Sequence, residues 1–152
     1  MIDSVPAVSI HDDRFKQALI LTEHLAVCRE NWLDRMTGGG RSQKPFFAKS
    51  AAELGSLLPR FEALEQAWVT YLNSLNDDAL SADFEFKSSD DESCCWNVEG
   101  QIRQLIGHAF YHRGQIVLLV DQLGGTTVDT DYLFWRYAQD TERWGCHKTV
   151  TP

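Results

Sequence analysis

The spacing of apolar residues along the chain predicts long helices separated by polar loops. From about 12 to 36, apolar side chains recur every three or four residues, the pattern of an amphipathic helix. The segment TGGGRSQKP, 37–45, follows with three glycines and a proline, which end a helix. The apolar stripe consists of Phe15, Ala18, Leu19, Thr22, Leu25, Ala26, Leu33 and Met36.

A second helix is predicted over about 50–75. Ser50 and Glu53 are spaced as a capping box, in which hydroxyl and carboxylate satisfy amides of the first turn. Pro59 lies inside the pattern, so we expect the helix to kink there or to begin afresh after it.

The helical periodicity breaks over 76–95, where DFEFKS, 83–88, alternates and predicts a short extended piece. A third helix is predicted over about 96–123 and a last one over about 129–144, with Thr130 as its candidate cap. Long helices with little strand signal predict an all-α bundle. We expect a single domain, 1–152, with a core at about 12–144 between a short irregular N-terminus and a C-terminal tail.

Composition and charge narrow the classes of partner. The 152 residues are 43% apolar and 24% charged, which is ordinary for a soluble protein. The formal net charge of -8 argues against sequence-independent nucleic-acid binding and against an anionic membrane surface. The most apolar run, 116–120, is too short to span a bilayer, and no secretory signal is visible. With four cysteines and no CxxC pair, we expect free thiols and a cytoplasmic protein.

The stretch HAFYHRGQ, 108–115, carries the first candidate chemistry. His108 and His112 are four residues apart, so a helix places both imidazoles on one face, where they can hold one ion. Histidine pairs with this spacing also occur in packed interiors and on surfaces without a metal, so the pair alone does not establish a metal site. Zinc peptidases place Glu directly after the first His, but Ala109 stands there, so a protease would lack its base.

His24 is the candidate third ligand. It lies in LILTEHLAV, among apolar residues, where a neutral histidine needs either a hydrogen-bond partner or a metal. Two helices packed about 8–10 Å apart can bring it opposite the other pair. Three imidazoles on one side of an ion leave positions open, as in catalytic rather than closed structural sites.

Three stretches together resemble the DinB/YfiT-like superfamily of helical-bundle metal proteins. They are TEHLAVCRENWLDRMTG, 22–38, GHAFYHRGQIVLLVDQLGG, 107–125, and TDYLFWRY, 130–137, and the resemblance covers about 15–140. It implies a four-helix bundle with a divalent metal ion, zinc or nickel, held by His24, His108 and His112. Members usually begin with a complete helix, yet only about twenty residues precede His24, so we expect that helix to be shortened or missing.

Two glutamines are candidates for polar contacts near the metal. Gln104 precedes His108 by one turn, where relatives often place another histidine, and could hydrogen-bond a ligand instead. Gln115 follows His112 by three residues and is expected either to orient a metal ligand or to make a packing hydrogen bond.

Cys28 and Arg113 are further candidates around the pocket. Cys28 follows His24 by one turn; a thiolate ligand there would close the site, while the alternative is a small core residue. Gly114 in mid-helix suggests a close backbone approach, which makes Arg113 a candidate partner of an acidic residue such as Asp131.

The resemblance also implies a function. Several members are transferases or isomerases that use low-molecular-weight thiols such as mycothiol or bacillithiol, so we expect a metal-dependent thiol S-transferase or isomerase acting on small electrophiles. Two alternatives stay open: a metal-dependent small-molecule hydrolase, and a non-catalytic metal-binding stress-response protein. A shortened bundle should leave apolar surface uncovered, so we also expect a homodimer.

Overall fold

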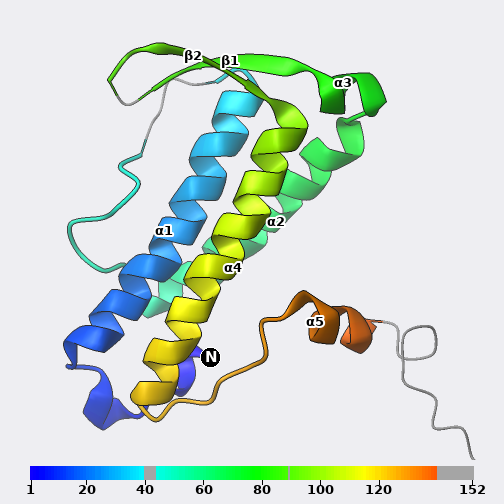
Figure 1. The fold of residues 1–152 in the computed structure, drawn as a ribbon. Coiled ribbons are helices and arrows are strands. Elements are labelled where there is room, and N and C mark those ends of the chain that lie inside the picture. The colour runs from blue at the N-terminus through cyan, green and yellow to red at the C-terminus, as the bar shows by residue number, and fades with distance from the viewer. Residues whose placement is uncertain (40–43, 89, 140–152) are drawn as a thin grey trace, which may run out of the picture.

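The computed structural model describes residues 1–39, 44–88 and 90–139. Its architecture is mostly helical, which confirms the predicted all-α fold class (Figure 1). Three long helices lie together, and a β-hairpin caps one end of α1 and α4. The elements are α1 (Asp13–Met36), α2 (Leu54–Ser74), α3 (Asp77–Ser81), β1 (Asp83–Lys87), β2 (Ser93–Asn97), α4 (Val98–Gln122) and α5 (Tyr132–Gln139).

The core forms where the apolar stripes of α1 and α4 meet, with α2 closing one side. The buried positions of each helix recur every three or four residues, as the helical period requires. His24 and His112 lie on these buried stripes, so the packing of α1 on α4 itself brings them together. The apolar core includes Ala18, Leu19, Leu21, Leu25, Leu57, Ala109, Ile116 and Val120.

The residues before α1 form two 3₁₀ turns, Ile2–Ser4 and Ala7–Ser9, and no α-helix precedes α1 in the described part of the chain. α1 begins at Asp13 and is capped by Asp12, whose carboxylate accepts from the amide of Arg14. Ile2 and Val5 of this short segment are buried and join the core.

The second helix begins later than predicted, at Leu54. The capping box was wrong: Glu53 is the N-cap but makes no side-chain cap hydrogen bond, and Ser50 lies outside the helix. α2 runs through Pro59 without ending, which excludes the fresh start that was one of the two expected outcomes. Pro59 lies near the start of the helix, where one missing amide interrupts only one bond of the ladder.

The extended piece predicted at 83–88 is β1, but its partner β2 was not foreseen. The strands are antiparallel, with Phe84 opposite Trp96. α4 therefore begins at Val98 and is capped by Asn97, whose side chain accepts from Gly100. The last helix begins at Tyr132, and a carboxylate one residue after Thr130 caps it. Its predicted end at 144 lies outside the described residues.

Candidate metal centre

Three imidazoles from two helices meet between α1 and α4. The ring centroid of His24 lies 5.0 Å from that of His108 and 4.8 Å from that of His112, and the latter two are 4.5 Å apart. The Nε2 atoms of His24 and His108 are separated by 3.1 Å. Two nitrogens on one tetrahedral zinc lie about 3.4 Å apart. The spacing is therefore close to that of two ligands of one ion.

The other nitrogen of His24 is held by the segment that follows α1. Its Nδ1 lies 2.6 Å from the carbonyl oxygen of Phe46, which can only accept, so Nδ1 carries the hydrogen. The neutral ring then has its lone pair on Nε2, facing the other histidines. Phe47 stacks on the same ring, with centroids 4.1 Å apart and planes within 5°. Both contacts fix the direction in which His24 offers its lone pair.

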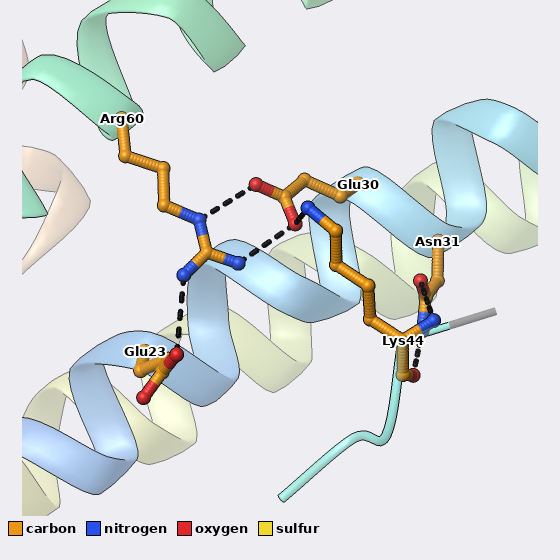
Figure 2. A network of polar contacts seen from close by, with 5 residues as sticks. All are labelled: Glu23, Glu30, Asn31, Lys44 and Arg60. Atoms are coloured by element: carbon orange, nitrogen blue, oxygen red, sulfur yellow. Dashed lines mark hydrogen bonds and ion pairs between the residues drawn. The ribbon is translucent and has the colours of Figure 1, made fainter. Parts of the chain in front are cut away.

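Asn31 ties this segment to α1. Its side chain, 1% exposed, donates from Nδ2 to the carbonyl of Lys44 at 2.7 Å and accepts from the Lys44 amide at 3.1 Å. Figure 2 shows this pair beside an ion-pair network in which Glu30 binds both Lys44 and Arg60. Arg60 also pairs with Glu23 at 3.3 Å. Ion pairs therefore link α1 to α2 and to the segment after α1.

His112 has a matching support on its own helix. Its Nδ1 lies 2.7 Å from Oε1 of Gln115, and an amide oxygen accepts, so this nitrogen also carries the hydrogen. The lone pair of His112 is again on Nε2. A hydrogen bond to the outer nitrogen of a ligand histidine is the usual way in which proteins fix its orientation.

Cys28 brings a sulfur to the same place. Its Sγ lies 3.5 Å from Nε2 of His24, close to the distance of about 3.6 Å between sulfur and nitrogen on one tetrahedral zinc. The ligand atoms of His24, Cys28 and His108 all lie within 4.8 Å of one another. The group could hold a metal ion, and it shares two histidines with the set predicted from the sequence. His112 is not in that group, although its ring centroid lies 4.8 Å from that of His24 and 4.5 Å from that of His108.

Burial sets the protonation of these groups. Burial lowers the pKa of His24, opposed by its hydrogen bond to Phe46. Burial also lowers the pKa of His108, to about 4, and the charges of the neighbouring histidines and of Arg29 add to this effect. Burial raises the pKa of the Cys28 thiol to about 11. Neutral imidazoles with one adjacent sulfur form a donor set that suits zinc and nickel.

A cavity of about 340 Å³ opens onto the cluster. Gln104 lines it, but its Oε1 accepts from Gln101 at 2.9 Å, not from a histidine. Within the described chain the lining contains no carboxylate. The walls are His24, Cys28, Trp32, Phe46, Phe47, Gln104, Leu105, His108 and His112.

Arg113 lies away from this pocket. Its guanidinium stacks 4.5 Å from the ring centroid of Phe110, and it lines a separate groove. Asp131 instead caps α5 by accepting from Leu133 at 2.7 Å, so the suggested pair between Asp131 and Arg113 was wrong. The expected close approach at Gly114 was wrong too, because nothing lies within 4 Å of the place where a Cβ would be.

Sequence reasoning missed two residues of α1 that contact the segment supporting His24. Asn31 and Arg35 are polar yet buried on α1, and Arg35 stacks between Trp32 and Phe86, with Phe46 nearby. Both polar residues stand on the apolar stripe, one and two turns after Cys28, and this pattern could have identified them from the sequence. A backbone carbonyl such as that of Phe46 leaves no signal in a sequence.

The fold and the cluster define a helical-bundle protein with a candidate centre for a divalent cation. The chain belongs to the DinB family: the family model matches residues 11–144. Neither the comparison with curated proteins nor that with solved structures gave a match. In the described part of the chain, no helix is long and apolar enough to cross a membrane.

Proposed function

We propose that the protein is a divalent-metal-dependent transferase or isomerase that joins a low-molecular-weight thiol to an electrophilic small molecule. The observation that carries the proposal is the convergence of three imidazole rings beside an open cavity of about 340 Å³. Three ligands leave room for a further group on the ion, which is the pattern of catalytic sites.

His24, His108 and His112 would hold the ion, zinc or nickel, through their Nε2 atoms. The tautomers of His24 and His112 leave those atoms unprotonated, which supports this assignment. When bound, the cation supplies a positive charge that stabilises a thiolate at neutral pH. The carbonyl of Phe46 and the amide of Gln115 keep two of the rings oriented.

The cavity walls favour thiol chemistry over hydrolysis. Hydrolysis by a metal-activated water usually uses a nearby general base or acid. No carboxylate lines the cavity within the described residues, so a hydrolase would lack that group. Trp32, Phe47 and Leu105 instead offer an apolar wall for a small organic electrophile.

Cys28 favours one alternative, a non-catalytic metal-binding protein. If its sulfur joined the three histidines, the four donors would form a closed site with no position for a substrate. The two functions therefore differ in whether Cys28 ligates, which spectroscopy can decide.

We further propose that the chain works as a cytoplasmic homodimer. Free Cys28, Cys94 and Cys95 fit a reducing compartment. Exposed apolar side chains outside the cavity support a dimer, among them Tyr111 and Leu118 on α4, 64% and 56% exposed. Light scattering should give twice the chain mass, and Leu118→Glu should give monomers; a monomeric wild type would contradict this.

Metal analysis of His24→Ala and His112→Ala variants tests the site. Protein purified without added metal should contain a divalent ion, and both variants should lose it while keeping their helicity. His11→Ala is the matched control, because His11 is an exposed histidine outside the cluster. Unchanged metal content in both site variants would refute the site. Turnover of a generic electrophile with several thiols tests the reaction, and no acceleration with any thiol would favour the non-catalytic alternative.

A further inference from the structure

A second, larger hollow lies between α2, α4 and the segment that leads into α5. It is a groove of about 650 Å³, within the range of sites for small organic molecules. In Figure 1, α5 stands apart from the three long helices. The groove is lined by residues of α2, α4 and α5. Its walls are largely apolar and include Trp68, Leu72, Ile106, Phe110, Tyr132 and Trp135.

Two arginines also line this apolar groove. The Nε of Arg113 is buried and has no hydrogen-bond partner, and its guanidinium lies over Phe110. Arg29 donates to the carbonyl of Leu25 at 3.1 Å and lies 5.8 Å from the ring centroid of Phe61. Neither arginine has a carboxylate within ion-pair distance in the part of the chain that the structure describes.

The two positive charges lie in one groove, and the described residues place no carboxylate within ion-pair distance of either one. Asp129 lines the groove, but its Oδ1 accepts from the amide of Asp131 at 2.8 Å in the turn before α5. Buried charges are costly unless they are paired. The groove therefore holds an excess of positive charge inside apolar walls.

We propose that the groove binds a small amphipathic anion, an apolar body ending in a carboxylate, with Arg113 and Arg29 as its counter-charges. A guanidinium matches a carboxylate in two parallel hydrogen bonds, and the unpartnered Nε of Arg113 is one of the donors that such a ligand would use. The aromatic and aliphatic walls would take the hydrocarbon or aromatic body.

This site is distinct from the metal centre, although the two are neighbours. Leu105 is the residue that lines both the groove and the metal cavity. No groove residue is a candidate metal ligand, so the proposal stands whether or not the metal centre is catalytic. Metal-depleted protein should still bind the anion.

Calorimetric titration with decanoate, below its micellar range, and with decanol as the neutral analogue tests the proposal. We expect saturable binding of decanoate, at least about tenfold tighter than that of decanol. Arg113→Gln and Arg29→Gln should each remove that preference while leaving decanol binding unchanged. Arg103→Gln is the matched control, because Arg103 lies on the same helix and pairs with Glu99 at the surface.

Three results would overturn the proposal. One is equal affinity for decanoate and decanol; another is a preference that survives in Arg113→Gln. The third is no binding of decanoate, whether the chain is a monomer or a dimer whose second copy covers the groove. If Arg29→Gln does not fold, Arg113→Gln carries the test, because the buried Nε of Arg113 has no hydrogen bond to lose.

Discussion

Replacing Asn31 with alanine should loosen the segment that orients His24. The Asn31 amide makes two hydrogen bonds to the backbone of Lys44, two residues before the carbonyl that holds His24. Neutral hydrogen bonds contribute about 0.5–1.5 kcal/mol each, so the loss should be about 1–3 kcal/mol. Lys44 is exposed, so water can reach its freed backbone groups, which keeps the cost within that range.

The same change should weaken metal binding through His24. Removing the partner that orients a ligand histidine typically costs about 10–100-fold in affinity. The Phe46 carbonyl itself remains in Asn31→Ala, and Phe47 still stacks on His24, so we expect the lower end, about tenfold. Urea unfolding of metal-free protein measures the stability, and competition with a chromophoric chelator measures the zinc affinity.

Two control variants separate the loop contact from general destabilisation. Asn31→Asp keeps the acceptor for the Lys44 amide but sets a buried carboxylate against the Lys44 carbonyl, so it should lose at least as much stability as alanine. Asn76→Ala removes a cap of α3, where the side chain accepts from Ala79 at 2.8 Å, and should lower stability without changing zinc affinity. If Asn31→Ala loses stability but binds zinc as wild type does, the segment does not control His24.

Four further predictions follow from single contacts. Gln115→Ala should lower zinc affinity by about 10–100-fold, measured by chelator competition, and unchanged affinity would exclude its orienting role. Cys28→Ala should abolish thiolate-to-metal charge transfer in the cobalt-substituted protein if the sulfur ligates; a wild type without that band has an open, histidine-only site. Burial raises the pKa of Glu30, but hydrogen bonds from Arg60 and Lys44 have the larger combined effect and hold this pKa below its usual value. The ionised Glu30 carboxylate therefore stabilises the fold above about pH 4.5, and this stabilisation is lost as the pH falls further. Glu30→Gln should therefore cost about 1–3 kcal/mol in urea unfolding at neutral pH and progressively less in acid, and a pH-independent difference would contradict this. Gly114→Ala should stabilise the metal-free protein by up to about 1 kcal/mol, because the added methyl meets open space on a helix; a loss of stability would show a hidden clash.

The sequence predicted the parts of this protein that depend on period and spacing. The stripes of α1 and α4 follow the 3.6-residue period, so the helices and the approach of His24 to the other histidines could be anticipated. The start of α2 could not, because Ser50 and Glu53 have the spacing of a capping box without forming its hydrogen bonds. Strand β2 was missed although it pairs with β1 across a short connection, because its residues, SCCWN, show no strict alternation of apolar and polar positions.

The sequence predicted which side chains form the site but not how their donor atoms are oriented. The spacing of His108 and His112 on one helix limits where they can lie, whereas the tautomer of His24 depends on a carbonyl 22 residues further along. The proximity of Cys28 was weighed from its spacing, but only the coordinates place its sulfur 3.5 Å from a histidine nitrogen. The sequence also did not predict that Arg29 and Arg113 line one groove, because the two arginines lie on different helices.

The acceptor that orients His24 is a main-chain carbonyl, and this affects which substitutions can occur in the family without loss of the contact. A side-chain replacement at position 46 leaves the carbonyl in the chain, so the acceptor atom does not depend on which residue stands there. The ring of Phe46 serves a different neighbour, Arg35, and can be exchanged as that arginine changes. Purifying selection for the orientation of His24 should fall instead on Asn31, a residue with no atom among the candidate ligands.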